Sequence, residues 1–398
     1  MRIGVTGPDL LLRNGGAQIH TLNLISNLSN KYNFIYLPNP CLYGKFKENI
    51  VEVEKRIEQL KNFGIAVTEF YYEIIKGNYT QKEILEKYKG ENVNILFNFD
   101  YLNTCIEPND FTLKLSYAMN IKMAVTVQGL ADFNIHLFPY IRDTLKLSHT
   151  YRILLIRGYQ YISRHILLYR LTHHKNLYKI LMVNSAYNKN IKIRNKGVEL
   201  LNPSNGIMNS EYTAQTNIEK ENKIIFSARL VYNKGIFELP KILQLLNQHQ
   251  KIRLVLVGQF VYESEKQQFF KLIDKYNLGD LIDYKGFQDD SSLYHEISTA
   301  KLMIYPSHSD SFSITISQAL LLHTPVVAYD IPGLEIYSNL KPVKLVGEFD
   351  YKHLIEAALE FLNMDNYLPL FNVDVAKFIN YHTWANVAEQ YNKLFNNL

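Results

Sequence analysis

The chain has 398 residues, of which 47% are hydrophobic and 20% charged, with a formal net charge of +5 at pH 7. These values are typical of a folded globular protein and exclude an intrinsically disordered one. The length is large for one hydrophobic core and sufficient for two domains.

Cysteine usage and the N-terminus indicate the compartment. Cys41 and Cys105 are too few for a disulfide framework and lack metal-ligand spacing, which favours a reducing environment. No apolar run approaches the roughly 20 residues that span a bilayer, and Met1 leads directly into a short strand rather than a signal-peptide core. We therefore expect a cytoplasmic protein.

The first predicted unit is a strand at 2–6, a loop ending in a glycine pair at 15–16, and a helix with apolar residues at helical spacing. Glycines before a helix N-terminus allow a phosphate or a sugar to approach the backbone closely. A tight turn is the alternative explanation of such a pair. His20 lies one turn inside this helix and either packs or faces a ligand.

Further strands are predicted at 33–37, 93–97, 123–127 and 181–185, and helices at 47–62, 80–89 and 110–119. The alternation of strands and helices predicts a doubly wound α/β sheet. Gln128 follows one of these strands. Its neutral amide can orient a hydroxyl group but cannot remove its proton, and it can also be a simple strand-end residue.

A basic segment covers residues 144–198. It contains eleven Lys or Arg residues and no Asp or Glu, more than the net charge of the chain, so the remainder is net negative. Residues 151–156 and 162–171 have the pattern of two amphipathic helices with a cationic face. A solvated face, nucleic-acid binding and contact with an anionic membrane are the alternatives. We favour the membrane, because no nucleic-acid-binding motif accompanies the charge.

A domain boundary is predicted at LNPSNGIM, residues 201–208, because Asn and Gly turn a chain sharply and a polar run follows. We expect a first domain at 1–204, a second at 205–375 and a terminal segment at 376–398. The second domain opens with a strand that ends near Arg229, and Lys234 precedes the next helix. Two cations at the carboxyl end of a strand suit a pyrophosphate.

The following strands, at 253–258 and 282–287, end in Gly258 and Phe287. Gly258 allows a close backbone approach. Phe287 either stacks on a base or packs in the core. Helices are predicted at 291–299, 351–362 and 384–395.

Residues 301–335 form a predicted βαβ unit, with strands at 301–305 and 325–329 and a helix from Ser311 to Leu322. The loop and the first helical turn of such a unit lie at the carboxyl edge of the sheet, where ligands bind. The free N–H groups of the first turn, at Phe312, Ser313, Ile314 and Thr315, can accept an anion. Asp310 and Gln318 are eight positions apart, so both can reach one extended ligand.

The string PSHSDSFSITISQALLLHTPVVAYDIPGLEIY resembles the signature of retaining glycosyltransferases of the GT-B fold, glycosyltransferase family 4. The resemblance places Asp310 on the donor sugar and Gln318 on the nucleotide ribose. The family has glutamates at these two positions, glycines where Ser311 and Ser313 stand, and a glycine at His323.

The same resemblance extends along the chain. GGAQIH matches a family pattern in which Gly16 faces the donor phosphates, and IIFSARL with VYNKG supplies Arg229 and Lys234 for the donor diphosphate. Phe287 corresponds to a position beside the nucleobase. Gln128 stands where the family often has a histidine on the acceptor side.

The resemblance implies two Rossmann-like domains facing across a cleft, with a C-terminal helix that returns to the first domain. It implies a hexosyltransferase (EC 2.4) that moves a sugar, with retention, from a UDP- or GDP-sugar to a glycan or lipid-linked acceptor. Cell-surface polysaccharide or glycoprotein glycan assembly at the inner face of the cell membrane is the expected context. We expect no cofactor, no metal and no nucleic-acid partner. The alternatives are a catalytically silent nucleotide-sugar-binding protein, motivated by the departures above, and a GT-B epimerase.

Overall fold

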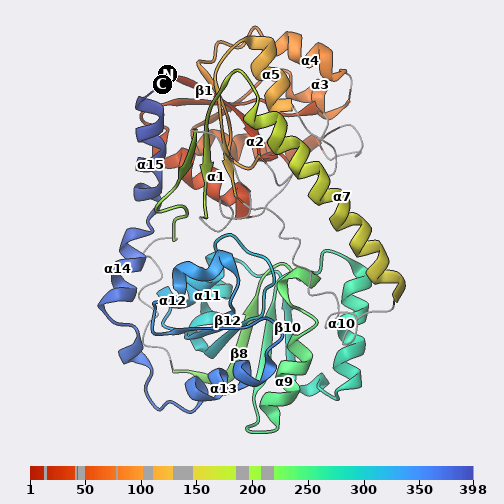
Figure 1. The fold of residues 1–398 in the computed structure, drawn as a ribbon, viewed down its shortest axis with the longest axis vertical. Helices are drawn as coiled ribbons and strands as arrows, with labels where there is room; N and C mark the ends of the chain where they lie inside the picture. Colours follow the sequence, from red (N-terminus) through yellow and green to blue (C-terminus); the bar gives the residue numbers. More distant parts are fainter. Residues whose placement is uncertain are drawn as a thin grey trace. The chain divides into compact units, whose positions relative to one another are not determined.

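The computed structural model describes residues 1–397 except 13–15, 41–42, 44–49, 78, 102–110, 129–146, 185–196 and 208–218. The described chain divides into two compact units (Figure 1). The first contains Met1–Ile135, Leu147–Gly206 and Trp384–Leu398, and the second contains Ile207–Thr383. Each is an α/β unit with its own parallel sheet.

The first unit is built on a seven-stranded sheet with the order β3-β2-β1-β4-β5-β6-β7, and every recorded pairing in it is parallel. Its central strands are buried along their whole length, as expected for a sheet covered on both faces. The strands are β1 Arg2–Gly7, β2 Asn33–Tyr36, β3 Ile65–Val67, β4 Ile95–Asn98, β5 Met123–Val127, β6 Leu177–Met182 and β7 Val198–Leu200.

The helices of this unit are α1 Gly16–Leu28, α2 Ile50–Asn62, α3 Tyr71–Ile75, α4 Gln81–Tyr88, α5 Phe111–Met119, α7 Leu147–Thr172 and α15 Trp384–Asn396. The last helix of the chain, α15, packs against α1 and buries Trp384, Tyr391 and Phe395 in the core of this unit. Gly206 is required at this junction, because a Cβ atom there would lie 2.4 Å from the Trp384 ring. The predicted return of the C-terminal helix to the first domain is confirmed.

Helix α7 differs from the prediction of two helices. It is one helix of 26 residues, drawn in yellow-green in Figure 1, and Gly158 lies in its interior. One glycine costs a helix only about 1 kcal/mol relative to alanine, which is too little to break one of this length. Within the described residues, no helix is long and apolar enough to cross a membrane.

The second unit is built on a six-stranded parallel sheet with the order β10-β9-β8-β11-β12-β13. Its strands are β8 Glu221–Ser227, β9 Arg253–Val257, β10 Ile282–Gly286, β11 Ala300–Tyr305, β12 Val326–Tyr329 and β13 Val343–Val346. The helices are α9 Leu239–Asn247, α10 Glu263–Lys275, α11 Asp290–Thr299, α12 Ile314–Leu321, α13 Tyr351–Leu362 and α14 Val373–Tyr381, with 3₁₀ turns at Tyr232–Lys234, Gly279–Leu281, Pro332–Tyr337 and Leu368–Leu370.

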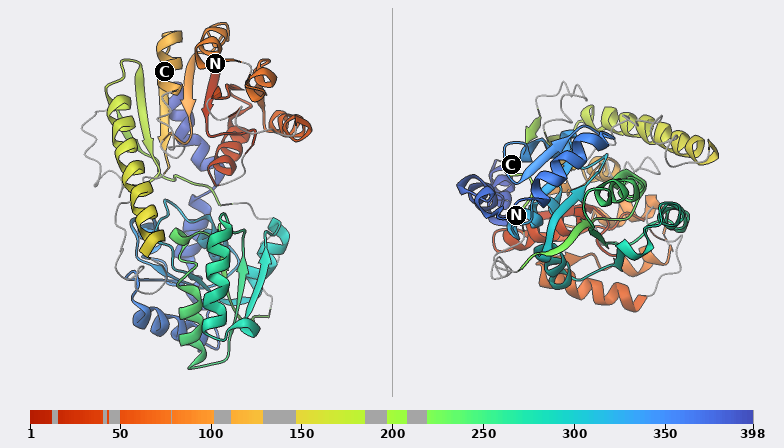
Figure 2. Two further views of the ribbon diagram at one scale, coloured as in Figure 1. Left: turned by 90° about the vertical axis from the view of Figure 1, so that its right-hand side faces the viewer. Right: turned by 90° about the horizontal axis from the view of Figure 1, so that it is seen from below.

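Helices cover both faces of this second sheet (Figure 2). Helix α9 contacts both α10 and α13, and α11 contacts α12. The predicted doubly wound α/β architecture is confirmed in both units. The compact units divide after Gly206 and after Thr383, so α14 lies in the second unit, whereas the sequence placed these boundaries at 204 and 375.

Candidate active site at the carboxyl edge of the second sheet

The second sheet has a topological switch point between β8 and β11. From β8 the chain proceeds outward to β9 and β10, and from β11 it proceeds outward in the opposite direction to β12 and β13. In open α/β sheets, ligands bind outside the carboxyl ends of the strands at such a point. The segments that follow β8 and β11 are therefore the expected location of a ligand site.

Glycines bring these segments into backbone contact. Gly235 has φ +77°, and a Cβ atom there would lie 1.9 Å from the carbonyl oxygen of Pro306. Gly258 has φ +132°, and a Cβ atom there would lie 1.9 Å from the carbonyl oxygen of Ala228. Only glycine fits both positions without strain. The close approach predicted at Gly258 is thus made by the chain itself, and it fixes the segment that carries Arg229.

Lys234 and Asp310 form an ion pair at the switch point. The Lys234 Nζ atom lies 2.9 Å from Asp310 Oδ2 and 2.9 Å from the Ser309 carbonyl oxygen. Tyr305, the last residue of β11, donates its hydroxyl to the same carboxylate at 2.6 Å. The side chains of Lys234 and Asp310 are 12% and 14% exposed, so the pair is largely but not completely desolvated.

The charge of Asp310 is maintained by these contacts. Burial alone would raise the pKa of this carboxyl group, but Lys234 and the hydrogen bonds from Tyr305 and the Ser311 N–H hold it below its ordinary value. Burial also raises the pKa of Tyr305, as does the negative charge of Asp310, so its hydroxyl remains a donor. Tyr305 is not among the site residues predicted from the sequence, although its place at the end of a central strand could have indicated it.

Arg229 is exposed two residues beyond the end of β8. No hydrogen bond or ion pair of its guanidinium group is recorded among the residues that the structure describes. It shares the carboxyl edge of the sheet with Lys234 and Asp310, because β8 and β11 are parallel neighbours. A guanidinium group without a recorded partner can bind an anion through two parallel N–H donors.

The N-terminus of α12 lies at the same edge, but it begins later than predicted. Ser313 has extended backbone angles and caps the helix by accepting the N–H of Ile316 at 3.3 Å, so the first helical residue is Ile314 rather than Ser311. Within the described chain no acceptor is recorded for the N–H groups of Ile314 and Thr315. These two amides are the unpartnered donors of this helix.

The prediction for Phe312 concerned its backbone N–H, for which no acceptor is recorded within the described chain, whereas Gln318 was predicted to bind the nucleotide ribose through its side chain. The Phe312 side chain is 5% exposed and packs against the rings of Tyr337 and His382. Gln318 is 6% exposed and donates its amide to the Tyr294 hydroxyl at 3.4 Å. Its side chain therefore packs between α12 and α11, and the prediction that it reaches a ribose together with Asp310 gains no support from this position.

Phe287 is 72% exposed and follows β10 directly. The core alternative for this side chain is therefore wrong. β10 is two strands from β8 in the sheet, so Phe287 lies about 10 Å from the end of β8 in the hydrogen-bonding direction. The ring is available to an external partner at the carboxyl edge.

In the first unit, Gly16 opens α1 with no heavy atom within 4 Å of a Cβ position. His20, one turn later, is 1% exposed, and its ring nitrogens contact Asn205 Oδ1 and the Tyr391 hydroxyl. Burial lowers the pKa of His20 to about 4, although the bond to Asn205 opposes the shift. His20 thus joins α1 to α15, and this placement agrees with the packing alternative stated for it in the sequence analysis.

Gln128 follows β5, is 9% exposed, and donates its amide to the Phe99 carbonyl at 2.9 Å. Its amide nitrogen is thus used by the loop after β4. This placement agrees with the structural alternative for Gln128. Among the described residues no group of His, Cys, Asp and Glu side chains has the arrangement of a metal site.

Two Rossmann-like units with parallel sheets of seven and six strands, the second bearing a charged edge and the C-terminal helix returning to the first, define the GT-B architecture of glycosyltransferases. Residues 208–368 match the family model described as "Glycosyl transferases group 1". The matched region contains the whole β8–β11 site, and together with the fold it identifies a glycosyltransferase. No curated protein sequence matches the chain.

Three solved structures are similar in fold. Anabaena Alr3699/HepE in complex with UDP and glucose has a TM-score of 0.68 at 12% identity over 100% of both chains. A glycosyltransferase from Rickettsia africae has a TM-score of 0.68 at 16% identity over 100% of this chain and 98% of that one. A single-residue mutant of S. aureus TarM, in complex with fondaparinux, alpha-GlcNAc-glycerol and UDP, has a TM-score of 0.69 at 12% identity over 99% of both chains.

Proposed function

We propose that this glycosyltransferase is a family 4 enzyme that moves a sugar from a nucleotide diphosphate sugar to its acceptor with retention at the anomeric carbon. The observation that carries the proposal is the Lys234–Asp310 ion pair beside a free Arg229 and two helix amides without a recorded acceptor among the described residues. These groups share the edge of one switch point. Their combined charge and geometry suit a diphosphate.

The leaving diphosphate carries the charge that develops during transfer. Lys234 Nζ donates to Asp310 and to the Ser309 carbonyl at 2.9 Å and to the Tyr305 hydroxyl at 3.5 Å, so a phosphate oxygen can replace this long third contact. The amides of Ile314 and Thr315 add donors that need no rearrangement, and the exposed Arg229 guanidinium can turn toward the diphosphate. Donors fixed in advance where charge develops stabilise a transition state more than flexible ones. In this proposal Asp310 orients both Lys234 and the donor sugar.

UDP is the preferred nucleotide in this proposal. The structures of HepE and TarM named above hold UDP, which supports a uridine donor for a chain of the same fold. The exposed Phe287 follows β10, a strand about 10 Å from β8 along the edge, which is a suitable span for a diphosphate to bridge to a stacked base. The structure of TarM also holds an α-linked GlcNAc-glycerol, which is what retention yields from an α-configured donor.

A transfer assay tests this proposal. Purified protein is incubated with UDP- and GDP-sugars and glycan or lipid-linked acceptors, and the anomeric configuration of the product is read by NMR. Arg229→Ala and Lys234→Ala should each lower transfer strongly, whereas Lys251→Ala, an exposed lysine before β9 at the opposite edge of the sheet, should not. Full activity in the first two variants, or an inverted product, would contradict the proposal.

A second candidate function is nucleotide-sugar binding without turnover. It is motivated by Gln318, Ser311 and Ser313, which stand where the resembled family has glutamate and glycines. The same assay separates the two functions. Tight UDP-sugar binding with neither transfer nor donor hydrolysis would favour a silent binding protein or partner subunit.

The proposed reaction requires no metal, because Arg229 and Lys234 supply positive charge to the diphosphate. Treatment with EDTA followed by gel filtration should leave the transfer rate within about twofold of the untreated enzyme. Activity that is lost on chelation and restored by Mg²⁺ or Mn²⁺ would contradict this part of the proposal.

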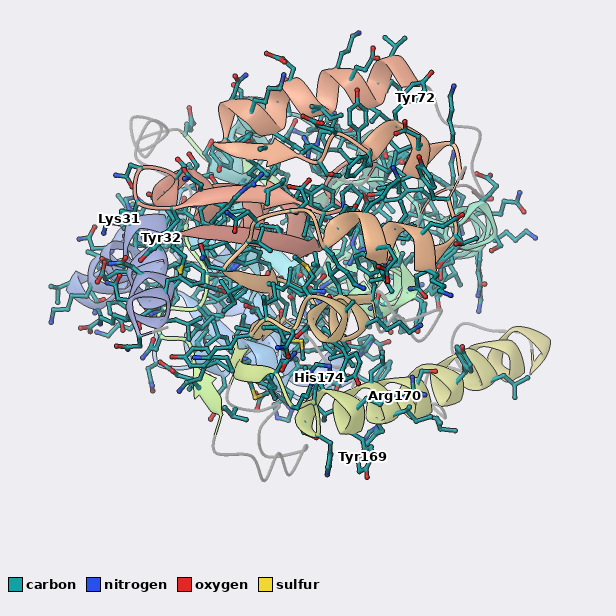
Figure 3. The ribbon with its side chains drawn as sticks, turned by 90° about the horizontal axis from the view of Figure 1, so that it is seen from above. Lys31, Tyr32, Tyr72, Tyr169, Arg170 and His174 are labelled. Atoms are coloured by element: carbon teal, nitrogen blue, oxygen red, sulfur yellow. The ribbon has the colours of Figure 1, made fainter. Side chains whose placement is uncertain are left out.

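We also propose that helix α7 binds an anionic membrane surface, which would bring the enzyme to lipid-linked acceptors of cell-surface glycan assembly. Five large side chains are exposed on one side of α7, with exposed fractions from 45% to 64%. Their spacing of four, three, four and three residues places them in one stripe, here called the α7 stripe: Leu155, Tyr159, Ile162, Ile166 and Tyr169. Figure 3 shows Tyr169 directed away from the first unit.

Charge favours an anionic partner for the α7 stripe. Residues 144–198 contain eleven Lys or Arg and no acidic residue, so two copies of this segment would repel each other. An anionic bilayer attracts each nearby basic residue by about 1 kcal/mol while accepting the apolar stripe. The opposite side of the helix is occupied by the unit itself, because Leu167, Leu168 and Leu171 are buried.

Vesicle flotation tests the membrane proposal. The protein should float with vesicles of phosphatidylglycerol and phosphatidylcholine at low salt, and less with phosphatidylcholine alone. Ile162→Ser with Ile166→Ser should reduce flotation, whereas Tyr262→Ser, an equally exposed aromatic of the second unit, should not. Vesicle binding that the double substitution does not reduce would contradict the membrane proposal. So would binding to RNA without binding to vesicles, or a dimer of the protein that the double substitution dissociates.

A further inference from the structure

A largely buried cluster on the same two segments as the Lys234–Asp310 pair has no role in the function proposed above. His308, in the β11–α12 loop, has Glu238 at its Nε2 atom at 2.9 Å and Glu348 at its Nδ1 atom at 2.6 Å. The ring stacks on Phe349 at 4.7 Å between centroids. Glu238 is 1% exposed and directly precedes α9, and Glu348 lies between β13 and α13.

The hydrogen-bond geometry determines the charge of His308. A neutral imidazole has one N–H and one acceptor nitrogen, whereas both ring nitrogens here face carboxylate oxygens, which only accept. The arrangement is satisfied when both nitrogens carry protons. Two carboxylates and one imidazolium in a buried space then form charge-assisted hydrogen bonds, which are among the stronger contacts in a protein.

The cluster joins the two segments that carry the site. Lys234 and Glu238 lie four positions apart on the segment after β8, and His308 and Asp310 lie two apart on the segment after β11. The pairs Lys234–Asp310 and Glu238–His308 therefore cross-link the same two segments twice. The backbone N–H of His308 also donates to the Asn233 carbonyl at 3.0 Å, which adds a backbone contact between the same two segments.

We propose that His308 is a positioning residue: as an imidazolium held between Glu238 and Glu348, it fixes the β11–α12 loop so that Asp310 and the Ser309 carbonyl hold Lys234 in place for the donor diphosphate. The effect on donor binding rests on the function proposed above. The hydrogen-bonded group of Glu238, His308 and Glu348, here called the clamp, does not rest on that function, because it is a property of the folded second unit. His308 does not touch the substrate in this proposal and acts through Lys234.

The surrounding groups determine the pH range over which the clamp is intact. Burial alone would lower the pKa of His308, but Glu238 and Glu348 raise it to about 9. Tyr329, the other titratable ring beside it, stays neutral because burial and nearby acidic groups raise its pKa. The stabilising effect is therefore complete below the ordinary histidine pKa of about 6.5 and is lost as the pH rises through about 9.

Histidine titration by NMR tests the clamp without any substrate. In protein labelled with ¹³C-histidine, one imidazole signal that is absent from His308→Gln should stay protonated until the pH approaches 9. Glu348→Gln removes one carboxylate at a half-buried position and should lower this midpoint by about one pH unit or more. Glu360→Gln, which removes a glutamate paired with Lys344 elsewhere in the same unit, should leave the midpoint unchanged.

UDP binding measured by calorimetry from pH 7 to pH 10 tests the consequence for the site. Affinity should fall about tenfold with a midpoint that follows the His308 titration, and Glu348→Gln should move both midpoints together. A histidine signal that titrates near pH 6.5 would overturn the clamp. A UDP midpoint that does not move with Glu348→Gln would overturn the positioning role. Absence of UDP binding at every pH would contradict the proposed donor and leave the NMR titration as the test of the clamp.

Discussion

The polar residues at the carboxyl edges of the two sheets differ in charge and in exposure to solvent. At the edge of the second sheet, Lys234 and Asp310 are charged and partly accessible, and Arg229 is exposed. At the edge of the first sheet, His20 and Gln128 are buried and neutral, and both are hydrogen-bonded to other parts of their own unit. The same architecture therefore uses its polar residues for ligand chemistry in one unit and for internal packing in the other.

The difference shows that the position of a residue in a fold does not fix its role. His20 and Lys234 each follow the first strand of their sheet, but α15 covers His20 and burial suppresses its charge. In the second unit the side chain of Arg229 stays exposed, so its charge remains usable. Substitutions should therefore affect activity in the second unit and stability in the first.

The largest effect is expected for Lys234→Ala. Loss of this cation removes charge stabilisation from the leaving diphosphate and should lower kcat/KM by about 10²- to 10³-fold, in the range of a lost oxyanion donor. Steady-state transfer kinetics measure it, with Lys251→Ala as the matched control at the opposite edge. A loss below about threefold would show that the charged edge is not the donor site.

The next largest effect concerns acid stability of the first unit. The unfolded protein protonates His20 below about pH 6.5, whereas the folded protein does so only near pH 4, so the free energy of unfolding should fall by up to about 3 kcal/mol across this window on acidification. Urea denaturation of the native protein and of His20→Gln at pH 7 and at pH 4.5 measures it. The variant should lose less stability on acidification. Parallel losses in both proteins would contradict a buried neutral His20.

Much of the architecture could be predicted from local sequence. The strands predicted at 301–305 and 325–329 agree with β11 and β12 to within one residue at their ends. Short, continuous apolar runs bounded by polar residues are typical of buried strands, so their ends can be predicted from the local sequence. The start of α12 could not be fixed in the same way. Ser311 and Ser313 are both good caps, and Ser313, the cap in the structure, has a carbonyl that accepts the Tyr337 hydroxyl at 2.9 Å, a tertiary contact that no local pattern predicts.

The site was predicted only in part, because it too depends on tertiary contacts. Lys234 and Asp310 were identified one by one, but their ion pair depends on the contact between Gly235 and Pro306. The Glu238–His308–Glu348 cluster joins residues from three segments, which no local pattern relates. A single glutamate in the apolar run IFELP was its only signal in the sequence. Burial, which determined the roles of His20 and Gln318, likewise depends on helices that are distant in the chain.

A smaller effect is expected at Phe287. Removal of an exposed ring that stacks on a base costs about 1–3 kcal/mol of binding, so Phe287→Ala should weaken UDP binding about tenfold or more. The melting temperature should not change, because a side chain that is 72% exposed contributes little to the core. Calorimetry with UDP and with inorganic pyrophosphate separates base from phosphate contacts. Equal losses for both ligands would contradict stacking.

The smallest effect is expected for Gln128→Met. This substitution leaves the Phe99 carbonyl without its amide donor and should reduce the free energy of unfolding by about 1 kcal/mol, while UDP binding changes less than twofold. Denaturant titration and calorimetry measure the two quantities. A loss of transfer far greater than the loss of stability would give Gln128 the acceptor-side role that its burial argues against.

A crystal structure of the protein soaked with UDP tests the central claim most directly. The account predicts β-phosphate oxygens within hydrogen-bonding distance of Lys234 Nζ and of the Ile314 and Thr315 amides, with the Arg229 guanidinium turned toward the diphosphate. UDP bound away from the carboxyl ends of β8 and β11, or with its phosphates directed away from Lys234, would contradict it.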